Sequence, residues 1–209
     1  MFSRMRYFVF RSVFGYLKDN RLFVIFSSLM IFGFLIGCAL VGQGTTSFSS
    51  QISDWFFKYR SVRQSTTFLT VIWQSFAASA VYLAADYLFG LCFYGCAGAA
   101  VLPFLKGLGL GSVCGFLYRT YSASGVAFSA LTVVPVGLIS SLILVLASRE
   151  SFLYSVGSAS VYLGRPAGAN YSINFKRYHL HYLFYFLMQL IAAGADGVVS
   201  LVFGRGFSF

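Results

Sequence analysis

Charged residues are scarce in this sequence. Only 10% of the 209 residues are Asp, Glu, Lys or Arg, whereas 58% are hydrophobic, and the mean hydropathy is +0.79. A water-soluble domain carries about a quarter charged residues. The low charge content therefore excludes a soluble globular fold, and the high apolar content excludes intrinsic disorder. Long unbroken apolar runs, in place of short alternating strands, predict an all-α, polytopic helical membrane bundle rather than a β-barrel.

Acidic residues are the rarest of the charged types. Five Asp and Glu stand against 15 Lys and Arg, which gives a formal net charge of +10. In a soluble protein this balance would indicate nucleic acid binding. Here the bases lie between apolar runs, and the sequence contains no nucleic-acid-binding motif. We therefore expect the bases to set membrane topology and to contact anionic lipids, with the lipid bilayer and not nucleic acid as the partner.

The usual motifs of catalysis and metal binding are also missing. There is no G-x-S-x-G motif and no Walker motif, and His179 and His181 have no carboxylate or cysteine nearby in the sequence. The four cysteines all lie inside apolar runs: Cys38, Cys92, Cys96 and Cys114. These features predict a protein that is not an enzyme, with no catalytic residues, no disulfide, no metal site and no cofactor.

The chain begins with a basic segment followed by a long apolar run. Within residues 1–21, Arg4, Arg11 and Lys18 are seven residues apart and share one helix face. This spacing predicts a cytoplasmic amphipathic helix at the membrane surface, or alternatively a basic flank that only orients the next segment. Residues 22–42 carry no charge and are long enough to cross the bilayer. They predict an uncleaved first span with a cytoplasmic N-terminus, which opens a bundle over 22–203 within a single membrane domain, 1–209.

Residues 43–66 are polar and contain a group of aromatic and basic side chains. That group includes Trp55, Phe56, Lys58, Tyr59 and Arg60. Aromatic residues beside bases are typical of a segment that rests on the membrane interface. The same residue types also suit a surface that binds a partner protein, and the sequence does not separate these two alternatives.

Two further spans are predicted between residues 67 and 121. We expect an interfacial start at 68–73 and a second span over 79–102 that ends at Pro103, with Lys106 just beyond it as a flanking base. Residues 107–121 are short for a span and rich in glycine, which allows close helix packing. They predict either a short third span or a re-entrant hairpin with the preceding segment.

The last part of the chain predicts a fourth and a fifth span. Residues 126–147 form the fourth, which Pro135 is expected to kink, and residues 180–203 form the last, after an amphipathic, polar stretch over 151–179. With five spans and a cytoplasmic N-terminus, ten bases fall on the cytoplasmic side and five outside. This distribution favours the proposed orientation of a multi-pass membrane protein.

Three ionisable residues fall within the predicted spans. Asp86 and Asp196 are both expected in the outer half of the bilayer, and Arg119 ends the third span on the same side. Because a charge in hydrocarbon is costly unless it is paired or hydrated, we expect Arg119 to cluster with Asp86 or Asp196. The cluster is either a structural pair that fixes helix register or a polar path or docking site, and the pattern favours the structural pair.

The second half of the chain is similar to a known family. The resemblance rests on a proline and glycine pattern that leads into a short turn and a proline-containing span: Pro103, Lys106, Gly107, Gly111, Tyr121, Gly125 and Pro135. Upstream, Gly33 and Gly37 lie in a similar first span. This order resembles the stage II sporulation protein M family. Relatives often carry glycine directly after the tyrosine, where this chain has Ser122.

The resemblance implies a non-enzymatic membrane anchor. Such a protein recruits two extracytoplasmic cell-wall hydrolases, stage II sporulation proteins D and P, to the septal membrane while the forespore is engulfed. Residues 55–63 are our own candidate for the surface that binds such partners. The alternative function is a permease subunit of an ATP-binding-cassette-type transporter, which would bind its nucleotide-binding subunit through the cytoplasmic stretch 148–179.

Overall fold

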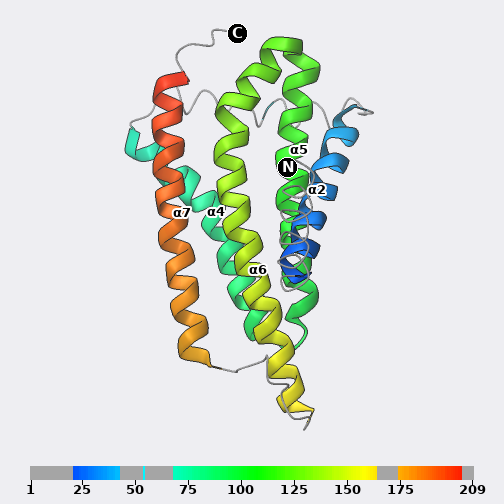
Figure 1. Cartoon of the computed structure of the whole chain (residues 1–209). Helices are drawn as coiled ribbons and strands as arrows, with labels where there is room; N and C mark the ends of the chain where they lie inside the picture. The colour runs from blue at the N-terminus through cyan, green and yellow to red at the C-terminus, as the bar shows by residue number, and fades with distance from the viewer. Residues whose placement is uncertain (1–20, 43–53, 55–67, 164–173, 204–209) are drawn as a thin grey trace, which may run out of the picture.

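The chain is a bundle of long α-helices. In the computed structural model, residues 21–42, 54, 68–163 and 174–203 are described (Figure 1). The elements are α2 (Arg21–Gly42), α4 (Phe68–Leu91), α5 (Gly95–Phe128), the π-helix η1 (Ser129–Val133), α6 (Val134–Tyr162) and α7 (Phe175–Phe203). The predicted all-α fold is therefore confirmed.

Four continuous helical stretches are long and apolar enough to cross a membrane. They are Arg21–Val41, Phe68–Leu91, Gly95–Tyr162 and Phe175–Ser200. The third stretch folds back on itself at Ser122, where the backbone leaves the helical conformation, so that α5 and α6 run in opposite directions (Figure 1). The described helices consequently form five long segments that alternate in direction, as expected for a multi-pass membrane protein. We call these segments legs. The ends of α2 and α7 and the turn at Ser122 lie at one end, called here the upper end (Figure 1).

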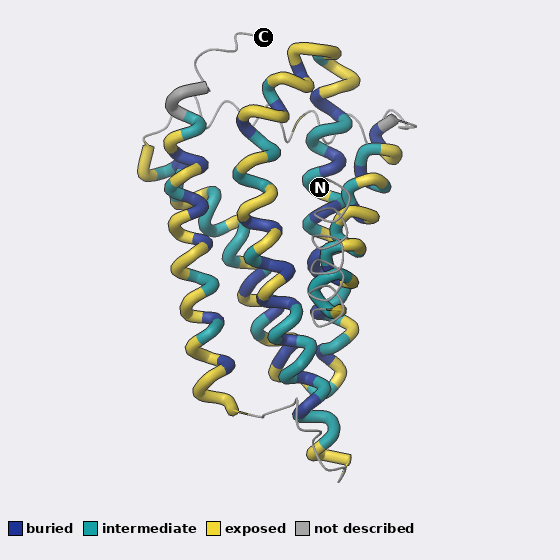
Figure 2. The backbone as a smooth tube through the Cα atoms, viewed as in Figure 1, coloured by how far each residue is buried: buried dark blue, intermediate teal, exposed yellow. Residues whose placement is uncertain are grey.

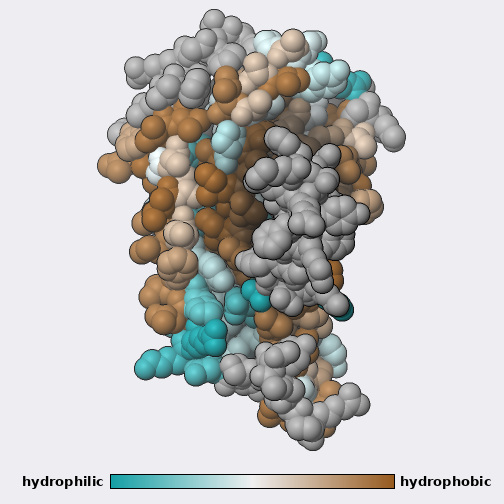
Figure 3. Space-filling model, in the orientation of Figure 1, coloured by the Kyte–Doolittle hydropathy of each residue, from teal (hydrophilic) through white to brown (hydrophobic). Residues whose placement is uncertain are grey.

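The outer surface of the bundle suits contact with lipid. Large apolar side chains such as Phe32, Leu69, Leu138 and Leu187 are exposed, whereas buried positions line the inner faces of the helices (Figure 2). On the face shown in Figure 3, apolar residues cover much of the middle of the bundle, and a group of hydrophilic residues lies near its lower end. An apolar exterior around a partly polar interior is favourable in a bilayer, because lipid solvates the outside while the helices satisfy one another inside.

The first span is confirmed, and α2 packs most extensively on α5. Glycines bring the two backbones together. A methyl group at Gly33 or Gly37 would lie 2.2 Å from the carbonyl oxygen of Phe104 or Leu108 of α5. In return, a methyl group at Gly107 would lie 2.1 Å from the carbonyl oxygen of Met30. Reciprocal glycines at four-residue spacing are the usual device for close packing of membrane helices.

The prediction for the second span was wrong in its limits. The helix α4 begins at Phe68, where we expected an interfacial segment, and ends at Leu91 instead of continuing to Leu102. The chain reverses at residues 92–94, and Gly95 starts α5 so close to the end of α4 that a methyl group there would lie 1.4 Å from the carbonyl oxygen of Phe89. This turn is apolar, so no polar residue marks it in the sequence.

The corrected turn also changes the third span. Pro103 lies inside α5 and does not end a helix, and Lys106 lies near the middle of that leg and does not flank it. The segment 107–121 is the upper part of the long leg that starts at Gly95, so it is neither a short span nor a re-entrant hairpin. Starting the helix at Gly95 gives this leg enough residues to cross the bilayer.

The fourth and fifth spans are longer than predicted. Pro135 stands in the first turn of α6, directly after the π-helix η1, which agrees with the expected irregularity at this proline. Residues 151–162 continue α6, although we expected them in a polar loop, and α7 begins at Phe175 and not near Leu180. The interfacial helix predicted for 1–21 lies outside the described residues except for Arg21, and so does the candidate partner surface formed by Trp55, Phe56, Lys58, Tyr59 and Arg60.

Candidate functional site: a polar column inside the bundle

Polar side chains follow the inner faces of α4, α6 and α7. On α4 they are spaced four, three and four residues apart, which places them on one helix face. On α7 the polar positions are four, seven and seven residues apart, which also places them on one helix face. We call the whole group the polar column, and it consists of Ser75, Ser79, Tyr82, Asp86, Lys106, Ser140, Ser148, Ser151, Tyr178, Tyr182, Gln189 and Asp196.

The lower level of the polar column surrounds Asp86. This carboxyl group is fully buried, and its Oδ2 accepts a hydrogen bond from the Tyr182 hydroxyl at 2.9 Å. The Ser151 hydroxyl donates to the backbone oxygen of Asp86 at 2.7 Å and is also hydrogen-bonded to the Tyr182 hydroxyl. Within the described part of the chain, Asp86 Oδ1 and the buried Ser148 Oγ have no hydrogen-bond partner at standard distances, although Ser148 is a close neighbour of the Asp86 carboxyl group. Part of the hydrogen-bonding capacity of this level is therefore unused.

Tyrosine rings pack around this level. Tyr178 stacks on Tyr154 and Tyr87 with ring centroids 4.4 and 5.4 Å apart, and its hydroxyl lies 3.2 Å from Ser151 Oγ. Gly90 makes room for it, since a methyl group there would lie 2.0 Å from the Tyr178 oxygen. The rings exclude lipid from Asp86, while their hydroxyl groups supply hydrogen bonds.

The middle level is centred on Lys106 of α5. Its ammonium group donates to Ser140 Oγ at 2.6 Å and to Ser79 Oγ at 3.2 Å, and it lies 5.2 Å from the centre of the Tyr82 ring. Ser140 in turn donates to Gln189 Oε1 at 3.2 Å. Four helices thus converge on one cation near the middle of the bundle. Among the described residues, no carboxylate lies within 4 Å of Lys106, so hydroxyl groups and a π-face stabilise it.

The upper level and the lower rim complete the polar column. Near the upper end, Ser75 of α4 donates to the carboxylate of Asp196 on α7. Near the lower end, His181 Nδ1 lies 3.5 Å from Glu150 Oε2, and the exposed His179 ring lies 3.4 Å from the Tyr87 hydroxyl. Polar groups therefore recur at several depths between the two ends of the bundle.

Among the described residues, no ion pair within 4 Å joins Arg119 to Asp86 or Asp196. Because α4 begins at Phe68, Asp86 lies near its lower end, about 16 Å along the helix axis from the level of Ser75 and Asp196. The two acids therefore lie at different depths in the bundle, and the expectation that they share one depth was wrong. Arg119 instead donates to the backbone oxygen of Val41 at 2.7 Å, where α2 ends. It stabilises one of the last carbonyl groups of that helix.

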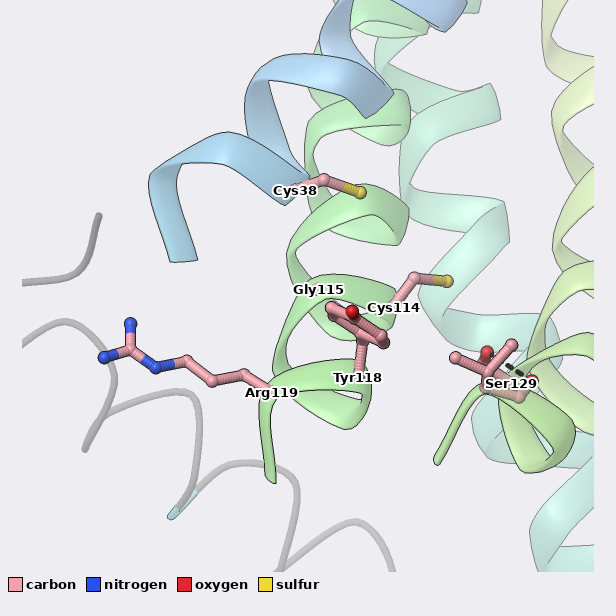
Figure 4. A pocket seen from close by; sticks show the side chains of 7 residues that line it. Cys38, Cys114, Gly115, Tyr118, Arg119 and Ser129 are labelled. Atoms are coloured by element: carbon pink, nitrogen blue, oxygen red, sulfur yellow. Dashed lines mark hydrogen bonds between the residues drawn. The ribbon is translucent and has the colours of Figure 1, made fainter. Parts of the chain in front are cut away.

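Arg119 also borders an open cavity near the upper end. The cavity has a volume of about 720 Å³ and is lined by residues that include Cys38, Cys114, Tyr118 and Ser129. Figure 4 shows that the Arg119 side chain extends away from Cys114 and Ser129. The Cys38 thiol donates to the Gly111 backbone oxygen at 3.2 Å. The cavity thus presents few polar groups, and its cation turns toward α2.

The family-like residues have mostly structural positions. Gly107 and Gly111 contact the backbone of α2, and Gly125 packs on the Leu117 carbonyl in the turn, where a methyl group would lie 2.0 Å from that oxygen. The Tyr121 carbonyl accepts a hydrogen bond from Ser124 in the same turn. Lys106 is the exception, since its side chain enters the polar column. Sequence reasoning included Lys106 in the family-like pattern but took it for a flanking base, because the second span was displaced. The spacing of Ser75, Ser79, Tyr82 and Asp86 could have revealed the polar face that it meets.

Comparisons with known proteins add no relative. No family model, no curated protein and no solved structure matches this chain.

Proposed function

We propose that this chain is a non-enzymatic membrane anchor of the stage II sporulation protein M type. In this role it holds peptidoglycan-remodelling hydrolases at the septal membrane of a bacterium during forespore engulfment. The observation that carries the proposal is the structural use of the family-like residues. The segment 103–142 forms one hairpin that is fastened to α2 by glycines, as a rigid scaffold requires.

The orientation of the bundle supports outer partners in this proposal. Among the described residues, Arg21, Lys176 and Arg177 lie at the lower end and Arg119 lies at the upper end. The positive-inside rule then favours a cytoplasmic lower end. In this orientation, α2 ends and α4 begins at the outer end of the bundle, the side on which cell-wall hydrolases act. Trp55, Phe56, Lys58, Tyr59 and Arg60 are our candidates for the contact.

Affinity purification tests the anchor. The tagged full-length chain is purified in mild detergent from membranes of its native host during sporulation, and proteins that co-purify are identified by mass spectrometry. We expect stage II sporulation proteins D and P with the unaltered chain and a clear loss of both in the double variant Lys58→Glu, Arg60→Glu. The matched control is Lys176→Glu, Arg177→Glu at the lower end, which should retain them.

Two results would contradict the anchor. The first is recovery of an ATP-binding subunit in place of hydrolases, particularly if the Lys176→Glu, Arg177→Glu variant loses it. That result would establish the competing function as a permease subunit with a cytoplasmic contact in 148–179. The second is equal recovery of hydrolases from all variants and from an unrelated tagged membrane protein.

A further inference from the structure

The polar column contains ionisable groups that packing alone does not explain. Asp86 is fully buried, and Lys106 lies near the middle of a membrane-crossing leg. Within the described residues, neither has a side chain of opposite charge within 4 Å. Ionisable groups without a counter-ion are costly inside a membrane and typically mark an ion or proton pathway. A purely structural bundle would be more stable with apolar residues at both positions.

The levels of the polar column are close enough to exchange a small species. Along α4, Ser75 is one helical turn from Ser79, and Tyr82 is one turn from Asp86, so each gap is about 6 Å along the axis. A single water molecule or a side-chain rotation spans such a gap. Asp86 Oδ1 and Ser148 Oγ, which are buried and have no hydrogen-bond partner among the described residues, supply free capacity on the lower side.

A chain of hydroxyl groups leads from Asp86 toward the lower end. It runs from Asp86 Oδ2 to the hydroxyl groups of Tyr182, Ser151 and Tyr178. The Tyr178 hydroxyl donates to the Tyr87 backbone oxygen at 2.9 Å, and the Tyr87 hydroxyl lies 3.4 Å from Nδ1 of the exposed His179. Each hydroxyl can accept one proton while it donates another. The hydroxyl chain thus carries a proton from Asp86 as far as Tyr178, and a bridging water molecule or a rotation of the tyrosine hydroxyl groups is needed for the last step to His179.

We propose that the polar column conducts protons between the two ends of the bundle, with Lys106 and Asp86 as the intermediate acceptors. In the resting state Lys106 is an ammonium group and Asp86 a carboxylate, and Lys106 first passes a proton to Asp86 and becomes a neutral amine. A proton that has bound the Asp196 carboxylate then passes through the hydroxyl groups of Ser79 and Ser140 to this amine, which restores the ammonium group. The proton leaves Asp86 through the hydroxyl chain, so every group regains its initial charge after a complete transfer.

The charge of Lys106 favours protons over metal cations. An ammonium group near the middle of the path repels a sodium or potassium ion, whereas it exchanges protons with its hydroxyl partners. Other titratable groups of the described residues also border the route toward its lower end, and they include Arg149, Glu150, His179, His181, Tyr87, Tyr154 and Tyr185. The proposal does not depend on the anchor function, so failure of either leaves the other standing.

Proton flux into vesicles tests the proposal. The purified full chain is reconstituted in vesicles of phosphatidylcholine and phosphatidylglycerol that contain a pH-sensitive dye, and a potassium gradient with valinomycin supplies a negative interior. We expect acidification faster than in protein-free vesicles and its loss in Lys106→Met and Asp86→Asn. The matched pair is Ser140→Ala, which should slow the flux, and Ser141→Ala, which should not, because Ser141 bonds only to Gly137 of its own helix.

Several outcomes would overturn proton conduction. Acidification no faster than in protein-free vesicles would do so, provided that the protein recovered from the vesicles elutes as a single species in size-exclusion chromatography. Equal flux in the unaltered chain and in Lys106→Met would do so as well. Uptake of sodium in the same vesicles, detected with a sodium-sensitive dye and without acidification, would show that the polar column conducts a metal cation and not protons. The Ser140→Ala variant, which removes a single hydroxyl, keeps the test valid where Lys106→Met fails to fold.

Discussion

Ser122 is the residue at which the long α5–α6 helical stretch reverses direction. Its φ of 48° and ψ of −125° lie in a region that glycine adopts readily and other residues adopt only at a cost. Its side chain is exposed, so nothing in the surrounding packing compensates for this cost. The position is also the one at which the resembling family often carries glycine. The turn is therefore formed despite an unfavourable residue.

Replacing Ser122 by glycine should stabilise the protein. We expect Ser122→Gly to raise the free energy of unfolding by about 1 kcal/mol through relief of backbone strain. The measurement is the temperature at which the detergent-solubilised protein loses its monodisperse peak in size-exclusion chromatography. The control is Ser124→Gly, which removes the hydrogen bond to Tyr121 O at a position without positive φ and should lower that temperature. A lower transition temperature for Ser122→Gly would contradict this account.

Asp86 and Lys106 are the central residues of the candidate site. Both are recognisable in the sequence as ionisable groups within or beside apolar runs. Their partners are not recognisable, because Tyr182 and Ser151 follow Asp86 by many tens of residues. Only the packing of α4 against α6 and α7 brings these hydroxyl groups to the carboxyl group.

Helix packing is the scale at which glycine matters most. Along α5, Gly107 and Gly111 face α2, and a methyl group at Gly111 would lie 2.0 Å from the Phe34 carbonyl oxygen. Gly109 lies between them, but nothing is within 4 Å of the position of its missing methyl group. Gly107 and Gly111 therefore allow α2 and α5 to approach closely, whereas Gly109 does not contribute to this contact.

Alanine substitutions at Gly107 and Gly109 should have different effects on stability. We expect Gly107→Ala to destabilise the protein by about 2 kcal/mol, because its methyl group would overlap the Met30 carbonyl and force α2 away from α5. Gly109→Ala should leave stability unchanged or slightly higher, since alanine favours the helix and has space. Thermal unfolding of both variants in the same detergent is the measurement. Equal destabilisation by the two substitutions would show that the α2–α5 contact does not depend on Gly107.

At the scale of elements, the start and end points of the spans were predicted least accurately. The run over 67–102 carries only a few polar residues, and none of them lies near residues 92–94, so hydropathy gave no reason to divide it there. Gly95 is the local signal that could have helped, because a tight reversal leaves no space for a side chain there. This single displaced turn caused the wrong depth of Asp86 and the wrong role of Lys106.

At the scale of the whole molecule, the described helices alternate in direction, so the start of α2 and the end of α7 lie at opposite ends of the bundle (Figure 1). In the orientation that we propose, the positive-inside rule makes the lower end cytoplasmic and the upper end of α7 extracytoplasmic. The proposed orientation also sets the direction in which any species would move along the polar column.

Reporter fusions in a bacterial host test this orientation. Alkaline phosphatase fused after residue 209 should be active, because it folds only outside the cytoplasm, and green fluorescent protein at the same site should be dark. Green fluorescent protein inserted between α6 and α7 should fluoresce. The reversed pattern would invert the bundle and place the segment between α2 and α4 in the cytoplasm, which would also remove the basis for extracytoplasmic partners.

The sequence by itself determined the class of protein. Low charge and long apolar runs require lipid as the solvent, and the glycine-rich segment 107–121 indicated close helix packing before its partner helix was known. Only the tertiary structure decided where the legs turn and which polar groups meet. Hydropathy does not indicate where a long apolar run turns, because its apolar positions are all compatible with lipid. The polar column exists because residues from four helices converge, and such convergence depends on contacts between segments distant in the chain.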